Sequence, residues 1–270
     1  MARKIFALLL IAVFLLQTPA AASNVSVHVD GRRLWGAYIT VDTTMVPLRR
    51  FCESISPDCS VSWNSRTRTA YVSAEGLSIT ARCGAEYITA NGRYIYVGRN
   101  SVISEAGVFM LPVRALAKAF DANVGWNGSK RSVSVTPGSG AIKSGDEFYD
   151  ADAVFWLARI ISAEAQGESL RGQIAVGNVV MNRVASPDYP NTIYKVIFDR
   201  QGGVQFTPVA NGTIYDEPAA ISVIAAKLVL DGADVAGECM YFLNYELSTS
   251  FWITENCSYV MTIGNHSFYV

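Results

Sequence analysis

The sequence predicts an α+β protein made of two parts, a small duplicated hairpin–helix–hairpin domain over residues 24–136 and a mainly helical domain over residues 150–270. Motifs that occur twice predict the first part, and apolar residues at helical spacing predict the second. Residues 137–149 begin with Pro-Gly-Ser-Gly, a composition typical of a linker. The chain therefore changes from strand-like to helical character across this linker.

Residues 1–22 have the pattern of a cleaved secretory signal peptide. Arg3 and Lys4 are followed by an uninterrupted apolar run over residues 5–16 and by three alanines at 20–22. The apolar run is short for a membrane span, and no stop-transfer pattern follows it. We therefore expect a secreted protein, with an uncleaved N-terminal membrane anchor as the alternative.

Charge and composition limit the partners. The 22 basic and 23 acidic residues give a formal net charge of −1, whereas nucleic acid binding usually needs a basic surface. The chain has two histidines and no CxxC motif, so we expect neither a metal site nor another cofactor. For an exported protein the simplest disulfide pairing is Cys52–Cys59 and Cys239–Cys257, with Cys83 left over. An anaerobic source would leave all five cysteines reduced.

The repeat in the first part combines two short motifs in each copy. MVPLR at 45–49 is followed by a Trp-Asn turn at Trp63, and MLPVR at 110–114 is followed by the same turn at Trp126. An Asx-Gly turn precedes each motif, VDGR at 29–32 and ANGR at 90–93. Each copy therefore reads as a hairpin, a short helix and a second hairpin. We expect both tryptophans to fill the cores of their half-repeats, with sugar-stacking platforms as the alternative.

In the second part, apolar periodicity and capping residues predict three main helices. The expected elements are, in chain order, a helix from Asp150 or Asp152 to Gly167, a helix over residues 170–184, a short helix over residues 193–198, a helix over residues 216–230 capped by Asp216, and a layer of strands and loops from Cys239 onward.

Glu164 and Glu168 stand one helical turn apart near the end of the first of these helices. Glu164 continues an apolar stripe formed by Leu157, Ile160 and Ile161, so we expect its carboxyl to be partly shielded from water. Shielding raises the pKa of a carboxyl, and an acid that stays protonated near neutral pH can donate a proton to a leaving group. The alternative is an ordinary solvated helix end, because glutamate pairs are common on helix surfaces.

Six blocks of the second part resemble the SleB/CwlJ-type cell wall hydrolase family, in the family's order. The blocks are AEAQGE (163–168), GQIAVGNVVMNRV (172–184), YPNTIYKVIF (189–198), VQFTPVANG (204–212), MYFLN (240–244) and IGNHSFY (263–269). The resemblance implies cleavage of peptidoglycan, in spore cortex or vegetative wall, by a domain with a lysozyme-like fold. It also implies that Glu164 is the catalytic acid and that glycan strands are the partner.

The repeat of the first part resembles the copper amine oxidase N-terminal domain. The pattern of MxPxR, a short helix and VxWN carries this resemblance in both copies. It implies a role as a stalk or as a cell-wall attachment module. It implies no copper site here, because this part of the sequence has no cluster of metal-ligand residues.

The residue chemistry favours a lytic transglycosylase that works with Glu164 alone. Such an enzyme needs one carboxylic acid, because the C6 hydroxyl of N-acetylmuramic acid takes the place of an attacking water. The other carboxylates considered, Asp199, Asp216 and Glu246, lie at the margins of the motif blocks. A hydrolytic muramidase and a wall-binding protein without activity are the alternatives.

Other residues of these blocks are candidates for binding the glycan or for holding the site together. The candidate substrate-binding residues are Glu168, Gln205, Phe206, Thr207, Tyr241 and Asn244. A structural role is the alternative for Glu168. We expect Asn182 and Arg183 to tie the second helix to neighbouring backbone through their side-chain donors. We expect His266 to be a buried hydrogen-bonding residue, since no GxSxG nucleophile motif accompanies it.

Overall fold

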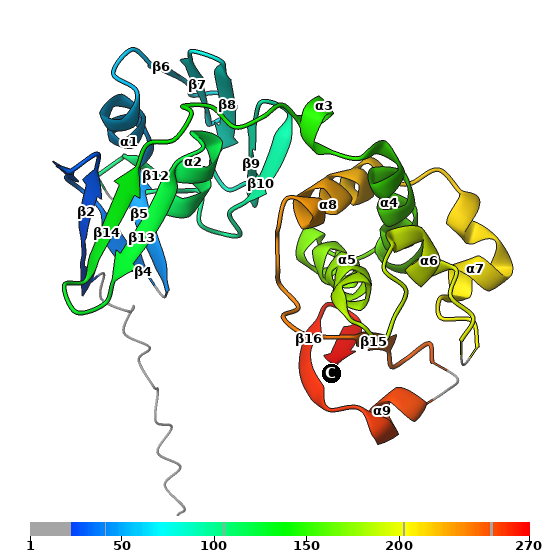
Figure 1. Ribbon diagram of the computed structural model, residues 1–270. Coiled ribbons are helices and arrows are strands. Elements are labelled where there is room, and N and C mark those ends of the chain that lie inside the picture. The colour runs from blue at the N-terminus through cyan, green and yellow to red at the C-terminus, as the bar shows by residue number, and fades with distance from the viewer. Residues whose placement is uncertain (1–22, 41, 105, 202, 249–250) are drawn as a thin grey trace, which may run out of the picture.

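The computed structural model describes residues 23–270 apart from residues 41, 105, 202 and 249–250. It has two parts with separate hydrophobic cores, connected through α3 (Gly145–Phe148) (Figure 1). The N-terminal part is built mainly of strands and the C-terminal part mainly of helices, so the α+β prediction is confirmed. The predicted signal peptide lies outside the described residues. None of the helices within those residues is long and apolar enough to cross a bilayer.

Three sheets form the N-terminal part, with strand orders β1-β4-β5-β12-β11, β10-β9-β8-β7-β6 and β13-β14-β2-β3. The strands are β1 (Ser23–Asn24), β2 (Ser26–Val29), β3 (Arg32–Leu34), β4 (Tyr38–Thr40), β5 (Thr43–Pro47), β6 (Ser60–Asn64), β7 (Thr69–Ala74), β8 (Leu77–Arg82), β9 (Tyr87–Ala90), β10 (Arg93–Tyr96), β11 (Val102–Ile103), β12 (Phe109–Pro112), β13 (Asn123–Asn127) and β14 (Ser132–Thr136).

The two copies of the repeat exchange halves. Strand β2 of the first copy pairs in parallel with β14 of the second, which joins the hairpins β2–β3 and β13–β14 in one sheet. The hairpin β9–β10 of the second copy in turn extends the sheet of β6, β7 and β8. At the centre, β5 and β12 pair antiparallel, with Pro47 opposite Met110 and Met45 opposite Pro112. The duplication therefore produces one interleaved domain.

Helices α1 (Leu48–Ile55) and α2 (Val113–Ala119) begin directly after the proline of each MxPxR motif, as the repeat predicts. Proline suits this place because its fixed φ matches the helix and its missing N–H has no intrahelical partner there. The two helices face a common core, where the rings of Phe51 and Phe120 lie 6.1 Å apart.

Trp63 and Trp126 do not fill this core, so that expectation is wrong. Their side chains are 40% and 50% exposed. The reason is topological: each tryptophan lies on an edge strand, β6 or β13, most of whose residues are exposed. The core is filled instead from inner strands, for example by Val72 of β7 and Val135 of β14.

All five cysteines are free, so the expected pairs Cys52–Cys59 and Cys239–Cys257 are not formed. The thiols of Cys52 and Cys59 make a hydrogen bond instead, and this bond together with burial raises the pKa of Cys52. Cys239 is buried in the C-terminal core, whereas Cys257 is half-buried at the end of α9 (Trp252–Asn256), and no bond joins them.

Three helices form the centre of the C-terminal part: α4 (Ala151–Ala165), α5 (Leu170–Ala185) and α8 (Ala220–Leu230). Gly177 of α5 allows their close approach, because a Cβ there would lie 2.8 Å from Ile161 Cδ1 and 2.9 Å from Val229 Cγ2. The elements around this centre are α6 (Ile193–Ile197), α7 (Thr207–Asn211), a 3₁₀ helix (Thr213–Tyr215), α9, and a sheet of order β15-β17-β16 formed by β15 (Tyr241–Asn244), β16 (Tyr259–Ile263) and β17 (His266–Tyr269).

The ends of these helices follow the capping residues, with one difference. Asp150 caps α4 as predicted, its carboxylate accepting a hydrogen bond from the N–H of Ala153. The helix expected from residue 216 begins only at Ala220. Asp216 instead ends the 3₁₀ helix, and the N–H of Ala219 donates to the Ser162 hydroxyl at 3.0 Å. The sequence signal was therefore correct for a helix but misplaced its start.

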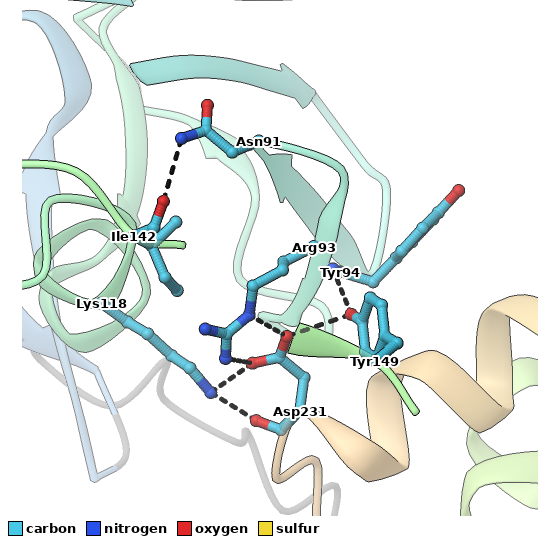
Figure 2. A network of polar contacts seen from close by, with 7 residues as sticks. All are labelled: Asn91, Arg93, Tyr94, Lys118, Ile142, Tyr149 and Asp231. Atoms are coloured by element: carbon cyan, nitrogen blue, oxygen red, sulfur yellow. Dashed lines mark hydrogen bonds and ion pairs between the residues drawn. The ribbon is translucent and has the colours of Figure 1, made fainter. Parts of the chain in front are cut away.

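A buried polar network joins the two parts at the end of α8 (Figure 2). Both carboxylate oxygens of Asp231 accept hydrogen bonds of 2.8 Å from Arg93 of β10, and Asp231 also forms an ion pair with Lys118 of α2. The Tyr149 hydroxyl donates to Asp231 at 3.0 Å and accepts from the N–H of Tyr94. Burial alone would raise the pKa of Asp231, but the bonds from Arg93 and Lys118 outweigh it and lower the pKa.

The predicted linker packs against the N-terminal part. Ile142 is buried, its N–H donates to Ala119 and its carbonyl accepts from the Asn91 side chain at 2.9 Å (Figure 2). The N–H of Gly145 donates to the Asn91 carbonyl, and a Cβ at Gly145 would lie 2.6 Å from the carbonyl oxygen of Gly92. Part of the predicted linker is therefore packed as an extension of the N-terminal part.

Candidate active site

Glu164 lies in the last turn of α4 and is half-buried. The apolar stripe that it continues is fully buried at Leu157, Ile160 and Ile161, which keeps the carboxyl close to the core. None of the described residues makes a hydrogen bond or an ion pair with this carboxyl. Burial raises its pKa from 4.5 to about 7. Glu164 is therefore an acid that is still partly protonated at neutral pH.

Glu168 occupies a different environment, because α4 ends at Ala165 and the chain turns away from the helix axis. Its carboxylate accepts hydrogen bonds from the Asn265 side chain at 2.9 Å and from the Asn265 N–H at 3.3 Å. Gly264 has a φ of +60° and no room for a side chain, since a Cβ would lie 1.8 Å from Glu168 Oε2. Glu168 thus fixes the turn between β16 and β17. The two glutamates do not share one helix face.

His266 is buried beside Glu168, with Nδ1 3.9 Å from Glu168 Oε1. Its burial is as predicted, but Nδ1 has no hydrogen-bond partner among the described residues. Burial lowers the pKa of His266, and the charge of Glu168 opposes this only in part. The ring packs edge-on against Phe242 at 5.3 Å. The histidine is therefore neutral at pH 7 and contributes mainly packing.

Arg183 brings three of the candidate binding residues together. Its guanidinium donates to the Gln205 side chain at 3.4 Å and lies 5.2 Å and 5.3 Å from the rings of Phe206 and Tyr241. It also donates to the Met240 carbonyl at 2.8 Å. The predicted backbone tie of Arg183 is confirmed, and so is that of Asn182, which donates to the carbonyls of Gly237 and Cys239.

The candidate binding residues differ in their access to solvent. Phe206 is buried, Gln205 and Tyr241 are half-buried, and Thr207 at the start of α7 is exposed. The Tyr241 hydroxyl accepts a hydrogen bond of 2.9 Å from Tyr189. Asn244 lies apart from this group, at the far end of β15 opposite His266. Gln205, Phe206 and Tyr241 thus form one cluster around Arg183, whereas Asn244 and Glu168 lie outside it.

The sequence reasoning missed the role of Gln173. It is buried in α5, its amide donates to the Glu168 carbonyl at 3.1 Å, and its oxygen accepts from the Ser222 hydroxyl at 2.8 Å. It therefore ties the connection between α4 and α5 to α8. A glutamine within an otherwise apolar helix face was the available signal, because buried amides need partners. The described residues hold no cluster of three or more metal-ligand side chains.

A half-buried carboxylic acid with a pKa near neutrality has the chemical properties of a general acid. The second glutamate, Glu168, is engaged by hydrogen bonds from Asn265. Comparison with known families places both parts of the chain. Residues 167–269 match the cell wall hydrolase family and residues 29–135 match the copper amine oxidase N-terminal domain. The chain therefore carries a cell wall hydrolase domain behind a copper amine oxidase N-terminal domain. The hydrolase match begins just after Glu164.

Several curated relatives match less than half of this chain. A spore cortex-lytic enzyme from Bacillus cereus is 35% identical over 120 residues, which cover 44% of this chain and 45% of the relative. The spore cortex-lytic enzyme of Bacillus subtilis strain 168 is 37% identical over 112 residues, covering 42% of this chain and 35% of the relative. The chain thus spans less than half the length of these relatives.

A solved structure also matches about half of this chain. It is the catalytic domain of the germination-specific lytic transglycosylase SleB from Bacillus anthracis, which is 33% identical in sequence. The match covers 48% of this chain and all of that domain, with a TM-score of 0.42.

Proposed function

We propose that this protein cleaves the glycan strands of peptidoglycan as a lytic transglycosylase, with Glu164 as its single acid and base. The observation that carries the proposal is the half-buried Glu164 carboxyl, whose pKa of about 7 lets it hold a proton under physiological conditions. The family match over residues 167–269 and the names of the relatives support the substrate class.

In this mechanism the Glu164 proton passes to the glycosidic oxygen as the bond from that oxygen to C1 of N-acetylmuramic acid breaks. The sugar becomes oxocarbenium-like, and its own C6 hydroxyl oxygen bonds to C1. The Glu164 carboxylate takes the hydroxyl proton, which regenerates the acid and leaves a 1,6-anhydro end. Glu168 is poorly suited to activate a water, because both of its oxygens accept hydrogen bonds from Asn265.

Some of the remaining candidate residues would contact the glycan, and the others would hold neighbouring segments in position. Thr207, Tyr241 and Gln205 have accessible side chains and would touch the glycan. Phe206 and Glu168 are too buried to bind sugar extensively and would position the loop before α7 and the β16–β17 turn. Asn244 pairs with His266 between strands β15 and β17, and it would help to hold this end of the sheet in place.

Replacing the acid tests the proposal directly. Glu164→Gln removes the proton donor but keeps the shape of the side chain, so the rate of glycan cleavage should fall at least about a hundredfold. The measurement is turnover of soluble glycan fragments by the full chain. Glu238→Gln is the matched control, because Glu238 is an exposed glutamate of the same domain. Near-normal turnover by the Glu164 variant would overturn the assignment.

The product identifies the reaction. We expect 1,6-anhydromuramyl ends, because a C6 hydroxyl on the same sugar needs no second carboxylate to position it. Mass spectrometry of digested peptidoglycan should show products one water lighter than those of hydrolysis, and they should resist borohydride reduction. Reducible muramic ends would instead indicate a muramidase, and the search for its second carboxylate would turn to Asp199, Asp216 and Glu246.

A further inference from the structure

The two copies of the repeat build two grooves at equivalent places of the N-terminal part. The larger has a volume of about 890 Å³ and is lined by Trp126 and Arg114. The smaller has a volume of about 340 Å³ and is lined by Trp63 and Arg49, the same motif residues of the first copy. Because the copies exchange halves, each groove also receives a strand from the other copy, β5 in the larger and β12 in the smaller.

One residue of that strand distinguishes the grooves. The residue before MxPxR is Phe109 in the second copy and Thr44 in the first. In the smaller groove Phe109 packs against Trp63, with ring centroids 5.5 Å apart, and occupies space over the indole. In the larger groove the equivalent place is held by Thr44, whose side chain is far smaller. Trp126 in the larger groove is accordingly somewhat more exposed than Trp63, 50% against 40%, and no aromatic ring of the described residues packs against it.

The lining of the larger groove combines an aromatic face with hydrogen-bonding groups. Trp126 offers an apolar ring and an N–H donor. The same groove is lined by the polar residues Arg114, Asp42, Asn100 and Thr43. Sugars present apolar C–H faces ringed by hydroxyl and amide groups, which this combination complements. A groove of this volume is in the range of ligand-binding sites.

The larger groove also lies against the catalytic part. Tyr96 lines it and at the same time packs on the hydrophobic core of the C-terminal domain. The network around Asp231 holds β10, on which Tyr96 lies, to the end of α8 (Figure 2). A polymer held in this groove would therefore lie beside the contact between the N-terminal part and the catalytic domain.

We propose that the groove at Trp126 binds a segment of the peptidoglycan glycan strand, with Trp126 as the stacking platform. The proposal rests on the proposed function for the choice of polymer. It assigns the attachment role to a specific site, and it predicts that Trp63, against which Phe109 packs, contributes less to binding. The rim carries both Asp42 and Arg114, which fits a substrate recognised by hydrogen bonds to hydroxyl and acetamido groups.

The test is cosedimentation of the full chain carrying Glu164→Gln with purified peptidoglycan sacculi, so that binding is measured without digestion. Trp126→Ala should raise the apparent dissociation constant about tenfold. Thr44→Phe, which copies the arrangement at Phe109, should weaken binding as well. Trp35→Ala is the matched control, because Trp35 is an exposed tryptophan of the same domain outside both grooves.

The result expected is weaker sacculus binding in both groove variants with Trp35→Ala unchanged, and weak binding of all variants to cellulose. Three outcomes would overturn the inference. Trp126→Ala could bind sacculi as tightly as its parent, or Trp126→Ala and Trp35→Ala could lose the same amount of binding. The parent could also bind cellulose as tightly as it binds sacculi. If Trp126→Ala fails to fold, Arg114→Ala at the exposed start of α2 takes its place.

The outcome for the groove is separable from that for the enzyme. If the groove variants still bind sacculi while Glu164→Gln abolishes cleavage, only the groove inference is wrong. If Glu164→Gln still cleaves glycan while the groove variants bind sacculi more weakly, the assignment of Glu164 is wrong and the groove inference stands.

Discussion

Glu164 and Glu168 differ in what surrounds their carboxyl groups. The Glu168 carboxylate accepts hydrogen bonds from Asn265, whereas the Glu164 carboxyl is buried without a hydrogen-bond partner among the described residues. Burial without partners disfavours the charged form, and this is why the pKa of Glu164 rises to about 7. Two glutamates four residues apart are thus suited to different tasks, one to transfer a proton and the other to fix a turn.

The raised pKa predicts the pH dependence of cleavage. The acid must be protonated to act, so kcat/KM should be highest below pH 7 and fall about tenfold per pH unit above it. Initial rates on soluble glycan fragments between pH 5 and 9 measure this. A rate that stays constant from pH 6 to 9 would contradict the role of Glu164.

Stability provides an independent check of the same pKa. The folded-state pKa of Glu164 lies above its ordinary value of 4.5, so the protein loses stability as pH rises from 4.5 through 7. Glu164→Gln lacks this loss. It should match the wild type in urea denaturation near pH 4 and exceed it by up to about 3 kcal/mol at pH 8. Equal stabilities at both pH values would show that the carboxyl is not desolvated.

At the scale of elements, the contact between β10 and α8 depends on one carboxylate. Asp231 is almost fully buried. It forms ion pairs with Arg93 and Lys118 and accepts a hydrogen bond from the Tyr149 hydroxyl. A buried pair adds little net stability when intact, because desolvation offsets the attraction. Removing one partner is costly, because it leaves the other charge buried and unsatisfied.

Asp231→Ala should therefore destabilise the protein by about 3 kcal/mol or more, since Arg93 would remain buried without a partner. Urea denaturation measures this. The comparison is Glu217→Gln, which breaks the exposed ion pair between Arg159 and Glu217 and should cost under about 1 kcal/mol. Equal effects of the two substitutions would mean that the Asp231 network does not hold the parts together.

At the scale of the whole molecule, the two domains share an interface although each has its own core. Tyr87, Tyr94 and Tyr96 of the hairpin β9–β10 pack on the C-terminal core. Ile142 and Gly145 fasten the connecting segment to the N-terminal part. Separate folding of the two parts, which the Pro-Gly-Ser-Gly linker suggested, would uncover this interface.

A fragment of residues 146–270 tests how far the domains are independent. It should still cleave soluble glycan fragments, because Glu164 and the residues around it lie within it. Its melting temperature should lie several degrees below that of the C-terminal transition of the full chain. The fragment lacks the tyrosines of β9–β10 that pack on its core, and it lacks Arg93, the partner of Asp231. Calorimetry of both proteins measures this. An unchanged melting temperature would show that the contact contributes no stability.

Local pattern in the sequence was enough for several features of this protein. The duplicated MxPxR and Trp-Asn motifs predicted α1, α2 and the hairpins, because turn and cap residues act on their own neighbours. The stripe of Leu157, Ile160 and Ile161 predicted α4 and the shielding of Glu164, because helical periodicity fixes which side chains share a face.

Only the tertiary structure decided the features that depend on partners distant in sequence. The copies exchange halves because β2 pairs with β14, and Trp126 faces a groove because β13 is an edge strand whose neighbour across the groove carries Thr44. Glu168 lies beyond the end of α4, and its carboxylate accepts hydrogen bonds from Asn265, 97 residues further along the chain. Each of these outcomes is set by contacts between segments far apart along the chain, which periodicity and capping do not encode.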